Sequence, residues 1–491
     1  MMQFVIAAPR SGSGKTTVTC ALLAALKKRG MVPCAFKSGP DYIDPMFHRA
    51  VLGVESHNLD LFFSAPETVR ALYAQAAAGH GAAVCEGAMG FYDGLGGVSD
   101  TASAWHLADT LGLPVLLVVQ PRGASLTLAA QINGLKQFRT PSHLAGILLN
   151  DCAPHLYALL APMLERETGL PVLGYLPHLP DAALESRHLG LKTAGEIADL
   201  QQKISRMADA LVMDWEKLFA LTEGAAPLVH TDRLLPAGEL PPQGAEEQRP
   251  RVPIAVARDA AFCFTYAETL EALERAGAEL CWFSPLQDSA LPEQIGGLYL
   301  PGGYPENRLE ELAGARLARE SIRSYIEAGG RTLAECGGMI YLSQSVLSDG
   351  DMDGGSFDTD GRIAGDGGRS SGSDGRNAGS SVGNIRNEMV GVLPFSVTNE
   401  RKRRKLTLGY RRFDYNGWRL KGHEFHYTQF AVPETDGKEG GACSLPPSIA
   451  QVYNAKGGKV TTPVFRYKNL IASYTHLYWG EVDVMALFGE L

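Results

Sequence analysis

The sequence has few cysteines, and they show no C-x-x-C pair. Eight cysteines are spread over 491 residues, at positions 20, 34, 85, 152, 263, 281, 336 and 443. This spacing fits neither a disulfide framework nor a zinc-binding pattern. We therefore expect reduced thiols and a cytoplasmic protein.

Long apolar runs and an excess of positive charge are also absent. No stretch reaches the roughly 18 apolar residues that a membrane-spanning helix needs. The chain begins with a strand pattern, not with the basic and apolar segments of a signal peptide. Because the net charge is −9 at pH 7, we expect no membrane partner and no nucleic-acid partner.

The sequence does contain a glycine-rich loop between a predicted strand and a predicted helix, Phe4–Ala7 and Val18–Lys28. In this context backbone N–H groups surround a phosphate, a lysine neutralises it, and the next hydroxyl binds Mg²⁺. Pro9 stands where the usual pattern has glycine, so an ordinary helix-capping turn is the alternative. The residues assigned to phosphate binding are Gly12, Ser13, Gly14, Lys15, Thr16 and Thr17.

Alternating strand and helix patterns predict two doubly wound α/β domains, an N-terminal P-loop NTPase-like one and a second α/β unit. We place the first domain at residues 1–222, a Pro/Gly/Glu-rich linker at 223–251 and the second domain at 252–491. A Gly/Ser/Asp-rich insert at 348–386 has too few apolar residues for a core. The predicted strands are 4–7, 32–36, 82–85, 115–119, 144–149, 171–175, 252–257, 280–283, 297–300 and 331–334.

Charged residues follow two of the first domain's strands, where a parallel sheet binds ligands. Asp41 and Glu86 are candidate Mg²⁺ ligands beside Thr16, and Lys37 is a candidate for the γ-phosphate of ATP. The alternative for each is a turn residue or a helix cap. Asp44 is interpreted only as a cap of the turn before Pro45. Asn150, at the end of a strand, is a candidate contact for adenine.

A cysteine lies on a predicted strand–turn–helix elbow in the second domain. Cys336 is followed by two glycines, and such an elbow exposes a nucleophile whose thiolate the helix N-terminus stabilises. His476 is the candidate base, because a thiol needs a nearby imidazole to ionise at neutral pH. The candidate oxyanion-hole residues, from the loop 301–306 and the elbow, are Gly302, Gly303 and Gly337.

Two further patterns admit simpler interpretations. His423 and His426 could bind a metal, but their spacing and aromatic neighbours favour a strand, with substrate contact or packing. The basic run 401–405 is interpreted first as a solvated loop, although it could hold a polycarboxylate.

Taken together, these motifs resemble the cobyrinate a,c-diamide synthase family of corrinoid (cobalamin) biosynthesis. The front half is similar to dethiobiotin synthetase, and the back half to the class I glutamine amidotransferase domain. The resemblance covers nearly the whole chain outside the insert. Its carriers are the segments 11–17, 39–45, 86–94, 187–191, 261–264, 301–306, 335–338 and 422–427.

The resemblance implies a ligase that uses ATP, Mg²⁺, L-glutamine and a corrinoid polycarboxylate. A side-chain carboxylate is phosphorylated, Cys336 releases ammonia from glutamine, and ammonia displaces the phosphate to amidate the a and c acetates. Tyr478 stands where most class I sites have a glutamate, so the third member of the Cys–His site is unassigned. Alternatives are the same reaction on hydrogenobyrinate or Ni-sirohydrochlorin, or a partition-type ATPase with a degenerate amidotransferase domain. Oligomeric state, with a homodimer as one option, is left open.

Overall fold

The computed structural model describes residues 1–182, 194–223, 251–349, 385–431 and 445–479. The chain folds into two compact units, one of residues 1–238 with 266–268 and one of 239–265 with 269–491. Most of the predicted linker and insert, and the motif at 187–191, lie outside the described residues.

The first unit is built on one eight-stranded sheet with the order β3-β2-β4-β1-β5-β6-β7-β8. Neighbouring strands are parallel except for β8, which pairs antiparallel with β7. Parallel strands covered on both faces are rich in apolar residues, and every residue of β1 and β5 is buried. The strands are β1 (Met2–Ala7), β2 (Pro33–Ser38), β3 (Glu55–Leu59), β4 (Ala82–Glu86), β5 (Val115–Val119), β6 (Leu144–Asn150), β7 (Val172–Leu176) and β8 (Val212–Met213).

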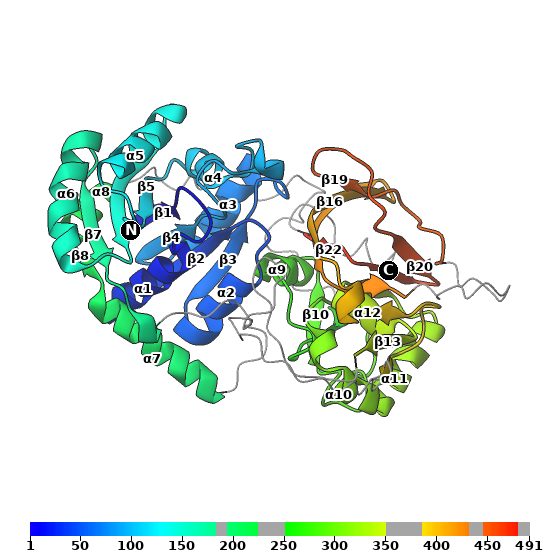
Figure 1. The fold of residues 1–491 in the computed structure, drawn as a ribbon. Coiled ribbons are helices and arrows are strands. Elements are labelled where there is room, and N and C mark those ends of the chain that lie inside the picture. Colours follow the sequence, from blue (N-terminus) through cyan, green and yellow to red (C-terminus); the bar gives the residue numbers. More distant parts are fainter. Residues whose placement is uncertain (183–193, 224–250, 350–384, 432–444, 480–491) are drawn as a thin grey trace, which may run out of the picture. The chain divides into compact units, whose positions relative to one another are not determined.

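Helices cover both faces of this sheet (Figure 1). Apolar residues of α1, α7 and α8 share one core with the inner residues of β1, so these three helices lie on one face. The helices are α1 (Lys15–Lys28), α2 (Ile43–Phe47), α3 (Pro66–Ala77), α4 (Ala104–Leu111), α5 (Leu126–Phe138), α6 (Pro154–Thr168), α7 (Ala194–Ala210) and α8 (Trp215–Thr222).

The second unit contains a six-stranded sheet with the order β10-β9-β11-β12-β21-β20. All neighbours are parallel except β20 and β21, which form an antiparallel pair. The strands are β9 (Val252–Ala257), β10 (Ala278–Phe283), β11 (Gly297–Leu300), β12 (Thr332–Glu335), β20 (Val464–Tyr467) and β21 (Leu470–Ser473). The helices that follow β9 are α9 (Ala267–Arg275), α10 (Leu309–Gly314), α11 (Arg316–Glu327) and α12 (Gly337–Leu342).

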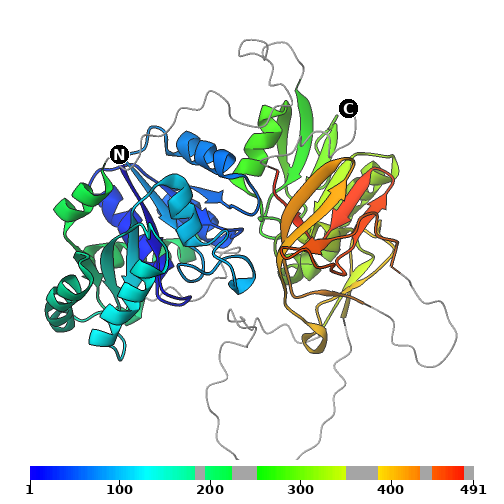
Figure 2. The ribbon, with the colours of Figure 1, turned by 90° about the horizontal axis from the view of Figure 1, so that it is seen from above.

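Two smaller sheets, mostly antiparallel, complete the second unit, with the orders β14-β13-β15-β18 and β19-β16-β17-β22. The long hairpin of β16 and β17, orange in Figure 2, dominates the latter. The strands are β13 (Ser345–Ser348), β14 (Ile385–Glu388), β15 (Val397–Thr398), β16 (Thr407–Tyr415), β17 (Trp418–His426), β18 (Gln429–Phe430), β19 (Tyr453–Asn454) and β22 (His476–Leu477).

The structure confirms the predicted α/β class with its two parallel sheets. The predicted strands 115–119, 252–257 and 297–300 coincide with β5, β9 and β11. The sequence did not indicate β3, β8, β20, β21 or most strands of the two smaller sheets, although the pattern around His423 and His426 favoured a strand where β17 lies. Within the described residues, none of the helices combines the length and apolar composition needed to span a bilayer.

Candidate active sites

The glycine loop of the first unit joins β1 to α1 and is held in shape by its own bonds. Gly14 precedes α1 in the left-handed conformation, at φ 86°, which glycine adopts without a Cβ penalty. The Nδ2 of Asn150 donates to Ser13 O at 3.1 Å. A Cβ on Gly14 would lie 2.0 Å from that Nδ2, so Asn150 and Gly14 fix the loop together.

Four side chains converge beside this loop, from α1, the end of β2, α2 and the end of β4. Thr16 Oγ1 donates to Glu86 Oε1 at 2.7 Å, and Lys37 Nζ lies 2.6 Å from the same oxygen. Lys37 also lies 2.5 Å from Asp44 Oδ2. The structure therefore brings Thr16, Lys37 and Glu86 together, as the sequence predicted, and adds Asp44.

Charge in this cluster is almost wholly buried. Glu86 is 0% exposed and Asp44 is 2% exposed. Burial would lower the pKa of Lys37, but the carboxylates of Asp44, Glu86 and Asp41 raise it on balance. The lysine is thus held as a cation, able to meet a transferring phosphoryl group.

Asp41 and Asp44 make contacts that the sequence alone did not indicate. Asp41 Oδ1 accepts from the backbone N–H groups of Ile43 and Asp44, so its carboxylate caps the turn that opens α2. Asp44, interpreted only as a cap, pairs with Lys37 instead. The density of carboxylates after β2 was the sequence signal for this cluster. It could not show which of the two aspartates contacts Lys37.

One oxygen of the cluster suits a divalent cation. Glu86 Oε2 is buried, and in the described part of the chain it has no hydrogen-bond partner. A carboxylate oxygen beside a threonine hydroxyl and a phosphate site is a fitting Mg²⁺ ligand. No group of three or more His, Cys, Asp or Glu that could hold a metal occurs among the described residues, so phosphate oxygens would complete the coordination.

The nucleophile elbow of the second unit lies between β12 and α12. Cys336 takes the strained backbone angles φ 44° and ψ −100°, typical of a residue presented at a sharp strand-to-helix turn. A Cβ on Gly338 would lie 2.1 Å from Leu300 O, and one on Gly337 would lie 3.1 Å from Gly303 N. Glycine is required at position 338, where a Cβ would collide with the backbone at the end of β11, and at position 337 it allows a close approach to the loop after β11.

The side chain of His476, a residue of β22, packs against that same loop. A Cβ on Gly302 would be 2.0 Å from His476 Cε1, so the predicted base and the predicted oxyanion-hole loop are in direct contact. The imidazole is 1% exposed. Burial first, and then the charges of His423 and His426, lower its pKa to about 3, which keeps it a neutral proton acceptor.

The thiol differs from the expectation of a stabilised thiolate. Burial, followed by the charges of Glu306 and Glu424, raises the pKa of Cys336 well above its usual value, and the Gly337 N–H lowers it only in part. The thiol donates to Phe425 O at 3.8 Å. The free site therefore holds a neutral thiol, and ionisation has to accompany catalysis.

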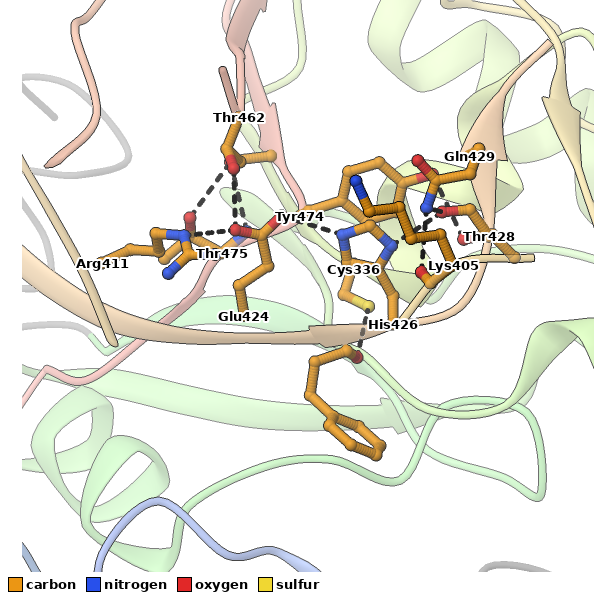
Figure 3. Close-up of polar contacts among 12 residues, drawn as sticks. Cys336, Lys405, Arg411, Glu424, His426, Thr428, Gln429, Thr462, Tyr474 and Thr475 are labelled. Carbon is orange, nitrogen blue, oxygen red and sulfur yellow. Dashed lines mark hydrogen bonds and ion pairs between the residues drawn. The ribbon is translucent and has the colours of Figure 1, made fainter. Parts of the chain in front are cut away.

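Sequence reasoning missed two buried carboxylates around this site. Glu335, directly before Cys336, accepts from Tyr299 Oη at 2.8 Å and from Leu477 N at 3.0 Å. It therefore joins the elbow strand to the residue after His476. Glu424, on β17, accepts from several side chains in the cluster of Figure 3. The alternating pattern of the strand that carries Glu424 was the sequence signal from which this carboxylate could have been found.

The two units match two different models of known protein families. Residues 4–191 match the family model described as the CobQ/CobB/MinD/ParA nucleotide binding domain, and residues 253–365 match the CobB/CobQ-like glutamine amidotransferase domain. Together with the two sites, these matches define the class: a nucleotide-dependent ligase that draws its nitrogen from glutamine.

Curated relatives narrow the class. The chain is 34% identical to cobyrinate a,c-diamide synthase of Synechococcus, over 98% of this chain and 95% of that protein. It is 37% identical to hydrogenobyrinate a,c-diamide synthase of Brucella abortus, over 97% and 98%, and 38% identical to cobyrinate a,c-diamide synthase of Clostridium tetani, over 71% and 76%. The chain belongs to this family of a,c-diamide synthases.

Proposed function

We propose that this protein amidates the a and c acetate side chains of cobyrinate, using ATP and glutamine-derived ammonia. The observation that supports it most is the presence of two separate candidate sites in one chain. A phosphate loop with a buried lysine–carboxylate cluster would serve activation, and a cysteine elbow and a neutral histidine, which both contact the loop after β11, would serve nitrogen release.

Activation makes a leaving group on a carboxylate that ammonia alone cannot attack. In the proposal Gly12 to Thr17 hold the ATP phosphates, Asn150 contacts adenine, and Lys37 stabilises the γ-phosphoryl group as it transfers. The substrate carboxylate oxygen attacks γ-phosphorus, the bond to ADP breaks, and an acyl phosphate forms.

The metal ion we propose is Mg²⁺, held by Thr16, Glu86 and Asp41 together with ATP phosphates. When bound it would neutralise charge on the β- and γ-phosphates. For Asp41 to serve, its second carboxylate oxygen would have to turn to the metal, because Oδ1 caps α2. Asp44 keeps Lys37 oriented beside the site.

Nitrogen release follows from the elbow. Cys336 loses its proton to His476, and the sulfur attacks the carboxamide carbon of glutamine, while N–H groups of Gly302, Gly303 and Gly337 receive the developing oxyanion. The protonated histidine returns the proton to the departing ammonia, and water then hydrolyses the thioester to glutamate. Ammonia displaces phosphate from the acyl phosphate and forms the amide.

The experiment is to incubate the protein with ATP, Mg²⁺, glutamine and one macrocycle at a time, and to weigh the product. Two added amides on cobyrinate are expected. A product from hydrogenobyrinate alone would replace the proposed substrate by the second candidate, which the Brucella relative favours. No product from either macrocycle would contradict both, and Ni-sirohydrochlorin would be tried next.

Small molecules are the partners we expect: ATP, L-glutamine and the corrinoid polycarboxylate. We propose a cytoplasmic location because each cysteine in the described residues is free, as a reducing compartment would keep it. The net charge of −9 argues against a nucleic-acid partner. The oligomeric state is left open, with a homodimer as one option, and light scattering would determine it.

A further inference from the structure

The strand residue just before the nucleophile has a buried carboxyl group whose contacts the proposed reaction does not use. Glu335 ends β12 and is 2% exposed. Its Oε1 accepts a hydrogen bond from the backbone N–H of Leu477 at 3.0 Å, and its Oε2 accepts one from Tyr299 Oη at 2.8 Å. The first donor belongs to the peptide group that joins His476 to Leu477, so this contact holds the backbone of the proposed base.

The elbow also holds the chain on the other side of His476. The backbone N–H of Cys336 donates to Ser473 O at 2.7 Å, within the pairing of β12 with β21. Two consecutive residues of the elbow thus bind the segment 473–477 at both of its ends. Only two residues separate β21 from β22, so the chain between the two contacts is short and the histidine lies within it.

A third contact restrains the same peptide group from the opposite direction. β17 pairs with β22, and Gly422 lies opposite Leu477 in this pair. A Cβ on Gly422 would lie 2.2 Å from His476 O, so the glycine lets β17 approach the carbonyl side of the peptide group whose N–H side Glu335 binds. Both polar atoms of this peptide group are therefore held between neighbouring strands.

The second donor to the carboxyl group comes from the strand that leads into the oxyanion-hole loop. Tyr299 lies in β11 and is 1% exposed. Its ring packs against the ring of Trp479, with centroids 4.8 Å apart, and Trp479 follows the proposed base by three residues. Glu335 therefore links β12 to β11 and β22, and these elements position the nucleophile, the oxyanion-hole loop and the base of the proposed reaction.

We propose that Glu335 is a positioning residue of the amidotransferase site: it holds the peptide group after His476 and so fixes the imidazole relative to Cys336. The proposal rests on the proposed function, in which His476 takes the thiol proton. Proton transfer needs the two side chains within hydrogen-bond reach, and a misplacement of about 1 Å can cost roughly a hundredfold in rate. Glu335 takes no part in the bond-making steps and determines where the base lies.

Two substitutions separate the reach of this side chain from its charge. Burial raises the pKa of Glu335 to about 8, so near neutral pH the group is mainly protonated. A glutamine has the same length, and its amide oxygen can accept from Leu477 N–H while its amide nitrogen donates to Tyr299 Oη. An aspartate is shorter by one methylene, roughly 1.5 Å, so it cannot reach both donors from the same backbone position.

Glutamine hydrolysis by folded variants tests the role. Glu335→Asp should lower kcat for glutamate release by at least about tenfold, because the base is misplaced, while KM for glutamine stays within about twofold. Glu335→Gln should keep kcat within about threefold of the wild type. A role in stability alone would reduce the amount of folded protein, measured by circular dichroism, and leave kcat per folded molecule unchanged. A wild-type kcat in folded Glu335→Asp would overturn the proposal.

The matched control is Glu327→Asp in the same unit. The Glu327 carboxylate also accepts from a tyrosine hydroxyl, that of Tyr467 at 3.0 Å, and pairs with Lys468 between β20 and β21. Its side chain is 44% exposed, and exposed contacts of this kind contribute little. Glu327→Asp should therefore leave both kcat and KM at the wild-type values.

Amide hydrogen exchange, resolved by NMR, tests the contact itself. In the wild-type protein the Leu477 amide should exchange at least about a hundredfold more slowly than an unprotected amide, because its hydrogen bond to Glu335 is buried. It should exchange at least about tenfold faster in Glu335→Asp and remain slow in Glu335→Gln. Unprotected exchange of Leu477 in the wild type would overturn the proposal, and that measurement needs no folded variant.

The exchange measurement contains no glutamine, so it is independent of the proposed reaction. If Cys336→Ser still hydrolysed glutamine, the proposed function would fail even with a protected Leu477 amide. If Cys336→Ser were inactive while folded Glu335→Asp kept the wild-type kcat, only the further inference would fail.

Discussion

At the scale of single residues, both sites depend on charges that are buried and paired. Lys37 lies between Asp44 and Glu86, and all three side chains are at most 5% exposed. Glu335 is buried beside the nucleophile. Removing one member of such a group leaves an uncompensated charge, which costs far more than breaking a surface pair.

Lys37→Met should lower the free energy of unfolding by about 3 to 5 kcal/mol, because two carboxylates lose their buried cation. It should also abolish ATP-dependent amidation. Lys28→Met is the matched control: its pair with Asp209 is 41% and 67% exposed, so the loss should stay below about 1 kcal/mol. Urea denaturation measures both, and equal losses would show that burial of Lys37 has no energetic weight.

Glu335 predicts a pH dependence of stability. Burial raises its pKa from 4.5 to about 8, so the folded protein favours the protonated form. Its contribution is full below about pH 4.5 and is lost as the pH rises through about 8. Glu335→Gln is neutral at every pH, so its free energy of unfolding should decline less between about pH 5 and pH 8 than that of the wild type. Parallel curves from denaturation at several pH values would refute this.

At the scale of elements, turns between strands and helices position the functional groups. The loop between β1 and α1 needs Gly14 in a left-handed conformation against Asn150. The elbow between β12 and α12 needs Gly338 against the end of β11, and Gly337 lies close to the loop that follows β11. In both places a side chain would move backbone groups that the proposed chemistry uses.

Gly14→Ala should weaken ATP binding by roughly tenfold or more, because its Cβ displaces Asn150 from Ser13 and strains the loop. Gly30→Ala, after α1, has a similar φ of 76° and nothing within 4 Å of the added Cβ. It should cost only about 1 kcal/mol of stability and leave ATP affinity unchanged. Calorimetric titration distinguishes the two, and adding Asn150→Ala to Gly14→Ala should give a less than additive loss.

At the scale of the whole molecule, two reactions are linked by a shared intermediate, ammonia. Cys336→Ser should reduce glutamine-dependent amidation by at least about a hundredfold. With ammonium salt as the nitrogen source it should keep activity within about twofold of the wild type, since the activation site is intact. Product mass measures both reactions, and a loss with ammonium as well would mean that Cys336 also supports the first site.

Whether a strand could be predicted from the sequence depended on whether its burial leaves a pattern in the local composition. Apolar runs such as Val115–Val119 and Val252–Ala257 predicted buried parallel strands because burial on both faces dictates composition. The segment Glu55–Leu59 did not predict a strand from its composition. It forms the edge strand β3, and its polar side chains become buried only through tertiary packing. The strands of two to four residues in the smaller sheets also left little pattern, whereas the alternation at His423 and His426 indicated the longer β17.

The same criterion separates the site residues that could be predicted from those that could not. Cys336 directly follows β12, Glu86 ends β4, and Lys15 begins the helix after the glycine loop, so the local pattern alone predicted where these three residues lie. Asp44 depended on the path of the loop after β2, and Glu424 depended on strand pairing with β16. Such contacts are formed by the tertiary fold and are not readable from local spacing.

The order of strands in the second sheet has a consequence for synthesis on the ribosome. β21 (Leu470–Ser473) pairs with β12, which carries the elbow, yet more than a hundred residues separate them along the chain. The nascent first unit holds all strands of its own sheet by residue 213 and can fold as soon as they emerge. The elbow strand must wait with an open edge until nearly the whole second unit has been translated, so this interval is when the growing chain most needs a chaperone.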